Sequence, residues 1–150
     1  MQKKVSALIA VRSGSVRVKN KNIRTFNDST LLELKIKQLQ SVKEINDVVV
    51  NSNSDEMLSI AKNLGARTVK RDDYYASNTI SMSSVFEHMA KNMDCENILY
   101  ANCTNPLVST NSYSDAIRIF LNNTSAYDSL VSCHDIKEFL YLDGKALNYD

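Results

Sequence analysis

A group of residue types suited to binding phosphate follows the first apolar run of the sequence. The run VSALIAV at 5–11 is typical of a buried strand, and the loop after it contains Arg12, Gly14, Ser15 and Lys21. Arginine and lysine donate charged hydrogen bonds, serine adds a hydroxyl, and glycine lets the backbone approach an anion closely. Because hydrogen bonds to charged groups contribute about 1.5 to 3 kcal/mol each, three or four of them can anchor a nucleotide triphosphate. The spacing therefore predicts a polyphosphate pocket where the strand ends.

The charge distribution supports this prediction. Residues 1–24 hold seven of the eighteen basic residues and no acidic one, so the other 126 residues carry eleven positive against seventeen negative charges. The formal net charge of +1 thus combines a basic N-terminal segment with an acidic remainder of the chain. Such a near-neutral balance argues against general nucleic-acid binding, which usually makes a whole domain basic. For Arg17, Lys19 and Arg24 a solvated basic loop is the alternative interpretation.

The composition favours a single domain over residues 1–150. The chain has 150 residues, 43% of them hydrophobic, which is enough for one substantial core. No run approaches the roughly 18 apolar residues of a membrane span, and the N-terminus has no cleavable leader, so we expect a cytoplasmic protein with no membrane partner. The three cysteines are widely spaced and are expected to be reduced thiols without a functional role.

Short apolar runs alternate with amphipathic segments along the chain. Helical spacing occurs at 31–42, 54–64, 82–89 and 113–120, and strands are expected at 47–50, 67–70, 97–101 and 129–133. This order predicts an α/β fold, a Rossmann-like three-layer open sheet that is mainly parallel and has helices on both faces. The loops after Val11, Val50, Lys70 and Ala101 should then meet at the carboxyl edge of the sheet. A hairpin is expected around Asp143-Gly144, and the ending at Asp150 soon afterwards favours a chain truncated at its C-terminus.

The loop after the first strand is neither a Walker P-loop nor a dinucleotide fingerprint, since GxxxxGK[ST] is absent and Gly14 lacks partner glycines. It resembles the ARxGSKxxxxKN signature of the acylneuraminate cytidylyltransferases, the CMP-sialic acid synthetase family that activates nonulosonic acids. The resemblance continues, in order, through three further segments. These are VVVNSNSDEMLSIAKNLGARTVKRD, YASNTISMSSV and LYANCTNPLVSTNSYSDAI.

The resemblance implies a nucleotide-diphospho-sugar transferase type of fold and a reaction used in surface polysaccharide biosynthesis. The anomeric hydroxyl of a sialic-acid-like sugar attacks the α-phosphate of CTP, which yields a CMP-sugar and pyrophosphate. In this sequence the resemblance implies catalytic contacts to the triphosphate from Arg12 and Lys21, loop donors at Gly14 and Ser15, and a sugar contact from Asn102. Four residues are implied for the ribose and cytosine: Asn22, Arg71, Ser77 and Thr79. Mg²⁺ is implied as the cofactor, with ligands that the sequence does not identify in this chain.

The sequence also departs from the family pattern. A family lysine is Val16 here, and two family aspartates are Asn53 and Asn78, so several charged groups are missing. These changes favour, as the alternative, a non-catalytic nucleotide-binding or assembly module of the same fold. A nucleotidyltransferase for another sugar or alcohol is the third hypothesis, although its GxGTR loop is absent. The identity of the sugar, catalysis by residues 1–150 alone, compensation for Val16 by Arg17 and formation of a homodimer are left open.

Overall fold

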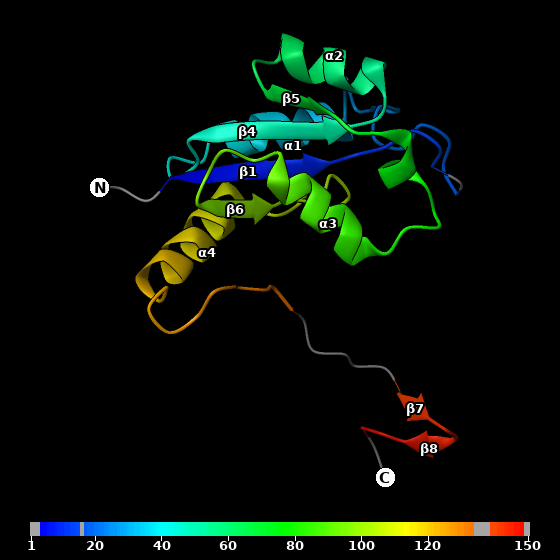
Figure 1. Cartoon of the computed structure of the whole chain (residues 1–150), viewed down its shortest axis with the longest axis vertical. Coiled ribbons are helices and arrows are strands. Elements are labelled where there is room, and N and C mark those ends of the chain that lie inside the picture. Colours follow the sequence, from blue (N-terminus) through cyan, green and yellow to red (C-terminus); the bar gives the residue numbers. More distant parts are fainter. Residues whose placement is uncertain (1–3, 16, 134–138, 149–150) are drawn as a thin grey trace.

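A four-stranded sheet forms the centre of the protein. The computed structural model describes residues 4–15, 17–133 and 139–148. The sheet has the order β5-β4-β1-β6, and each of its three strand pairings is parallel (Figure 1). Its strands are β1 (Val5–Ala10), β4 (Asp47–Ser52), β5 (Arg67–Lys70) and β6 (Asn97–Tyr100). All four strands therefore end at the same edge, and this confirms the predicted open parallel sheet.

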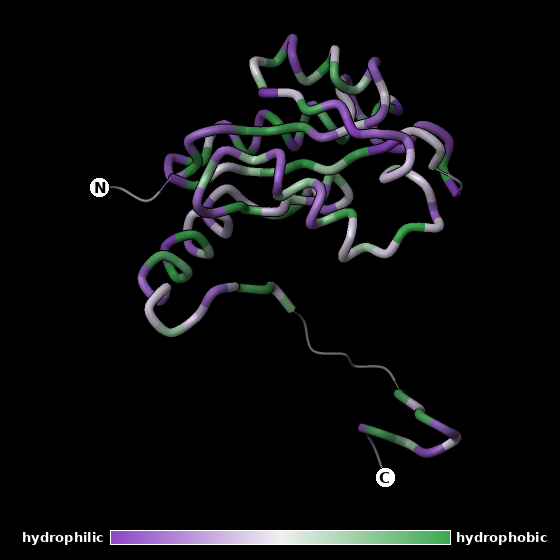
Figure 2. Tube along the Cα trace, viewed as in Figure 1, coloured by the Kyte–Doolittle hydropathy of each residue, from purple (hydrophilic) through white to green (hydrophobic). Residues whose placement is uncertain are grey.

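Helices cover both faces of this sheet. In β1, Val5, Ala7 and Ile9 point to one face, where they pack with apolar residues of α1 (Leu31–Gln40), α2 (Asp55–Asn63) and α4 (Thr110–Asn122). Leu8 points to the other face and packs with α3 (Met82–Lys91). Because neighbouring side chains of a strand alternate between faces, an apolar strand needs a helix on each side. The predicted three layers are confirmed, and green apolar stretches run along the central strands in Figure 2.

Each of the four α-helices begins with a side-chain cap. The hydroxyl oxygens of Thr30, Ser54, Ser81 and Ser109 accept hydrogen bonds from backbone amides of the first turns of α1, α2, α3 and α4. Each cap satisfies an amide that has no partner inside the helix. After α2, Gly65 adopts φ +76°, a left-handed conformation that ends the helix.

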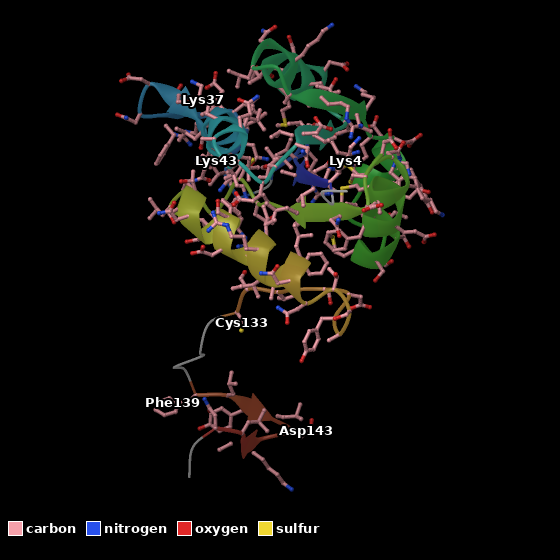
Figure 3. The ribbon with its side chains drawn as sticks, turned by 90° about the vertical axis from the view of Figure 1, so that its left-hand side faces the viewer. Lys4, Lys37, Lys43, Cys133, Phe139 and Asp143 are labelled. Carbon is pink, nitrogen blue, oxygen red and sulfur yellow. The ribbon has the colours of Figure 1, made fainter. Side chains whose placement is uncertain are left out.

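Three short elements complete the described chain. A hairpin of β2 (Thr25–Phe26) and β3 (Ser29–Thr30) precedes α1, and the 3₁₀ helix η1 (Asp73–Ala76) follows β5; neither was predicted. The predicted hairpin at Asp143-Gly144 is confirmed as β7 (Tyr141–Leu142) and β8 (Lys145–Ala146). Figure 3 labels Asp143 at its turn. Both turn residues have positive φ, as a two-residue hairpin requires.

The strand expected at 129–133 is wrong. These residues have no regular secondary structure, and Leu130 and Val131 are 50% and 80% exposed. A strand is stabilised by hydrogen bonds to a neighbouring strand and by burial of its apolar face, and this segment has neither among the described residues. β6 is therefore the edge strand on this side of the sheet. No helix of the described chain is long and apolar enough to cross a membrane. The assignment of residues 1–150 to one domain stays a prediction.

Candidate functional site

A pocket opens at the carboxyl ends of β1 and β6. One wall is the segment that follows β1, and the other is the loop that follows β6. Of the residues proposed from the sequence, six line it: Arg12, Gly14, Ser15, Lys21, Asn22 and Asn102. The carboxyl edge of a parallel sheet is where α/β proteins bind ligands, because loops from neighbouring strands converge there. The pocket therefore lies at the end of the first strand, as the sequence predicts.

The lining of this pocket is cationic. Arg12, Arg17 and Lys21 all contribute to it, and the described residues add no carboxylate. Arg12 and Lys21 are nine positions apart in the chain, and both line the same cavity. Several cations around one concave surface favour a ligand with more than one negative charge.

Two backbone features shape the loop of the first wall. Gly14 has φ +79°, and a Cβ atom built there would meet no atom within 4 Å, so glycine is required by conformation and not by space. Asn22 is buried, and its carbonyl oxygen accepts a hydrogen bond of 2.9 Å from the amide of Leu32. The loop is therefore joined directly to the first turn of α1.

Arg12 also joins the pocket to the segment after η1. Its Nη1 donates to the carbonyl oxygens of Ala76 at 2.5 Å and Ser77 at 3.2 Å, and its Nη2 donates to Asn78 Oδ1 at 2.5 Å. The planar guanidinium suits such a fork of acceptors. Ser77 and Thr79 do not line the pocket; their hydroxyls are bonded to each other at 3.0 Å. Ser77 is linked to the pocket by the hydrogen bond that its carbonyl oxygen accepts from Arg12, and Thr79 is linked only by its bond to Ser77.

Asn53 connects the segment that follows β1 to η1. Its Oδ1 accepts from the amide of Ser13 at 3.1 Å, and its Nδ2 donates to Ser13 Oγ and to Asp73 Oδ1, both at 2.9 Å. An aspartate at this position would place a second acceptor against the carboxylate of Asp73. The departures Asn53 and Asn78 therefore each have a structural partner, whereas Val16 lies outside the described residues.

Arg71 is buried next to the carboxyl ends of β1 and β4 and does not line the pocket. The residue is 5% exposed, Nε donates to Asn51 Oδ1 at 2.6 Å, and Nη2 donates to the carbonyl oxygens of Asn51 at 2.8 Å and Val11 at 3.3 Å. Burial lowers the pKa of Arg71 from its ordinary value, and the nearby charge of Arg12 acts in the same direction. These contacts hold the carboxyl ends of β1 and β4 together.

Sequence reasoning missed two residues of the second wall, Cys103 and Thr104. Cys103 was expected to have no role, but it is only 4% exposed and forms part of the pocket surface. Burial raises the pKa of its thiol to about 12, although the charges of Lys35 and Lys21 act in the opposite direction. The signal that could have revealed both residues is their position directly after β6, beside Asn102.

The described residues do not form a metal site by themselves. Among them, no three His, Cys, Asp or Glu side chains lie close enough together to hold a metal ion. A Mg²⁺ ion prefers carboxylate and phosphate oxygens, which the described lining of this pocket does not supply.

The fold and the pocket define an α/β protein with a cationic pocket at the carboxyl edge of a parallel sheet. The sequence pattern of the cytidylyltransferase family matches residues 6–145, so it spans the sheet, both walls of the pocket and the C-terminal hairpin. The chain therefore belongs to the cytidylyltransferase family.

Comparisons with individual proteins agree with this assignment. Pseudaminic acid cytidylyltransferase of Campylobacter jejuni is 26% identical over 126 residues, which are 80% of this chain and 54% of that protein. CMP-N,N'-diacetyllegionaminic acid synthase of the same species is 36% identical over 70 residues, 47% of this chain and 30% of the other. The matched part is thus about half or less of these curated relatives.

Solved structures show the same fold. CMP:2-keto-3-deoxy-manno-octonic acid synthetase complexed with CTP superposes with a TM-score of 0.72 at 10% identity, over 82% of this chain and 49% of that one. A cytidylyltransferase from Leptospira borgpetersenii gives a TM-score of 0.66 at 25% identity, over 81% and 50% of the two chains.

Proposed function

We propose that this chain is the CTP-binding part of a cytidylyltransferase that activates a nonulosonic, sialic-acid-like sugar. The observation that carries the proposal is the convergence of three cationic side chains, Arg12, Arg17 and Lys21, on one pocket at the carboxyl edge of a parallel sheet. The family match and the names of the relatives support the choice of CTP and of a sugar acid.

The reaction joins the two substrates at the α-phosphorus of CTP. The anomeric hydroxyl oxygen forms a bond to this phosphorus, the bond to the bridging oxygen of the β-phosphate breaks, and pyrophosphate leaves with the electron pair. The hydroxyl proton passes to solvent or a base. Such transfers are accelerated mainly by alignment and by cations that neutralise charge on phosphate oxygens. We assign that work to Lys21 and Arg12, with donors from the Gly14-Ser15 backbone.

The remaining residues are assigned by their place around the pocket. Asn102, on the wall after β6, is proposed to contact the sugar acid, and Asn22 the ribose. Ser77 and Thr79 are proposed to approach the base, since Arg12 holds their segment beside the pocket. For Arg71 the contacts favour a supporting role, because its bonded donors reach Val11 and Asn51 instead of the cavity.

Mg²⁺ is proposed as the cofactor that would neutralise charge on the triphosphate, but the described lining of the pocket has no carboxylate that would hold it. A cytoplasmic location is proposed because nucleoside triphosphates are supplied there.

A second candidate is a nucleotide-binding module without turnover. It is favoured by the lack of a carboxylate in the described pocket lining and by asparagine at positions 53 and 78. Binding of CTP without release of pyrophosphate would support it.

Pyrophosphate release tests the proposal directly. The chain is incubated with CTP, Mg²⁺ and, in turn, pseudaminic, N,N'-diacetyllegionaminic and N-acylneuraminic acid. Turnover with at least one acid is expected, and Lys21→Ala should lower it by about 100 to 1000-fold, the scale for losing one charge-stabilising donor. Lys19→Ala is the matched control, because Lys19 is exposed in the same segment and does not line the pocket. Equal losses in both variants would overturn the role of Lys21.

A further inference from the structure

The loop between β6 and α4 is held by two side chains of α1. Residues 101–109 have no regular secondary structure, so their carbonyl groups need partners from elsewhere. Lys35 Nζ donates to the carbonyl oxygen of Asn105 at 2.8 Å, and Gln38 Nε2 donates to those of Pro106 and Val108. Three carbonyls of this loop are thus satisfied by α1.

Lys35 is the more unusual of the two residues. It is 1% exposed, and its Nζ also donates to Tyr113 Oη of α4 at 2.8 Å and to Gln38 Oε1 at 2.5 Å. These three acceptors are uncharged. Burying an ammonium group has a large desolvation cost, which lowers the pKa of Lys35 from its ordinary value. A methionine would fill the same space without that cost, so the charge and its donors have a purpose other than packing.

The loop that Lys35 holds is one wall of the pocket. It contributes Asn102, Cys103 and Thr104, while Lys21 stands on the opposite wall. The opposite wall is attached to the same helix, since the amide of Leu32 donates to the carbonyl of Asn22. α1 therefore carries attachments to both walls, and Lys35 sits one turn along from Leu32.

We propose that Lys35 is a positioning residue that sets the place of the Asn102–Thr104 wall relative to Lys21, and thereby the fit of the sugar acid. The sugar-acid part of this inference rests on the function proposed above; the positioning of the wall does not. Lys35 acts through the loop backbone and touches no substrate.

The rate of alkylation of Cys103 reports how accessible this wall of the pocket is, and it does not depend on enzymatic activity. Wild type, Lys35→Met and Lys37→Met are treated with iodoacetamide, and each cysteine is followed by mass spectrometry. Lys37 is the matched control, because it is exposed on the same helix (Figure 3). Lys35→Met should accelerate labelling of Cys103 by about tenfold through local opening, with Cys95 and Cys133 unchanged. Loss of the Lys35 charge alone would slow the reaction, since that charge favours the thiolate.

An unchanged or slower rate at Cys103 in Lys35→Met overturns the positioning of the wall. If Lys35→Met does not fold, Tyr113→Phe replaces it, because that variant removes one of the acceptors of Lys35 and leaves the helices intact. It should accelerate Cys103 labelling in the same direction, and no acceleration there overturns the inference equally.

Steady-state kinetics then separate positioning from general damage. In Lys35→Met the KM for the sugar acid should rise by about 10 to 100-fold, the scale expected when a wall shifts by an ångström or less, while the KM for CTP stays within about twofold. Equal rises in both KM values would show a merely structural role. If the wild type itself has no turnover, the proposed function fails, and the Cys103 rates still decide the positioning of the wall.

Discussion

Asn53→Asp restores the residue type of the family pattern, and the structure predicts that this change is harmful here. The amide Nδ2 of Asn53 lies 2.9 Å from Asp73 Oδ1 and also donates to Ser13 Oγ. In the variant an oxygen replaces this nitrogen, so the hydrogen bond to Asp73 is lost and two carboxylates meet, whereas the Ser13 hydroxyl can turn and donate to the new oxygen.

The expected cost follows from these distances. Two unit charges 2.9 Å apart repel by about 1.4 kcal/mol in water, and the lost hydrogen bond to Asp73 adds about 1 kcal/mol. After discounting for screening by salt, the free energy of unfolding should fall by about 2 kcal/mol at pH 7. Asn53→Ala adds no charge but loses all three hydrogen bonds of the Asn53 side chain, including the one that Oδ1 accepts from the Ser13 amide, so its loss should be about 1 to 2 kcal/mol.

Urea unfolding between pH 3 and 7 separates the two contributions. Below about pH 4 carboxyl groups become protonated, so the repulsion disappears and Asn53→Asp should approach wild type in stability, whereas the deficit of Asn53→Ala should change little. The folded Asn53→Asp variant takes up a proton more readily than its unfolded chain, and this makes its deficit in stability relative to wild type shrink as the pH falls. Stability of Asn53→Asp equal to wild type at pH 7, or a deficit that does not change with pH, would refute the reasoning.

Two further outcomes follow from the structure. Hydrogen bonds from Ser114 and Arg118 lower the pKa of Glu44 below its ordinary value of 4.5, so its contribution to stability is present at neutral pH and is lost as the pH falls. Glu44→Gln should therefore unfold at lower urea than wild type at pH 7 and match it near pH 2; a gap that persists at pH 2 would contradict this cause. Gly14→Ala should lower the free energy of unfolding by about 1 to 2 kcal/mol, because φ +79° is strained for any residue with a Cβ. Ser15→Ala is its control, and equal urea midpoints in the two variants would show that the loop relaxes.

The sheet could be predicted because β1, β4 and β6 contain short apolar runs between helical patterns, whereas β5, with the sequence RTVK, gave only a weak signal. Val48, Val49 and Val50, for example, are buried on both faces, and this gives a continuous apolar run instead of an alternating one. The hairpin at 25–30 was missed because two residues per strand leave no periodicity to detect. The strand at 129–133 was predicted from its apolar residues, but composition does not show whether a neighbouring strand is present.

The pocket could be predicted in part for a related reason. The loop after β1 carries its own signal, since Arg12, Gly14 and Lys21 are close in the chain. Lys35 gave no such signal, because a lysine on an amphipathic helix is normally solvated and its acceptors at 105 and 113 are about 70 residues away. The contacts of Arg12 with Ser77 and Asn78 span a similar separation and were equally hidden.

Calorimetric titration with CTP, CMP and cytidine tests the central claim most directly, because it asks whether the cationic pocket recognises the phosphate chain. CTP should bind more tightly than CMP, cytidine should show no binding at the same concentrations, and Lys21→Ala should weaken CTP by at least about tenfold while Lys19→Ala does not. Equal affinity for CTP and cytidine, or an unchanged affinity of Lys21→Ala for CTP, would contradict the assignment of this pocket to a nucleotide triphosphate.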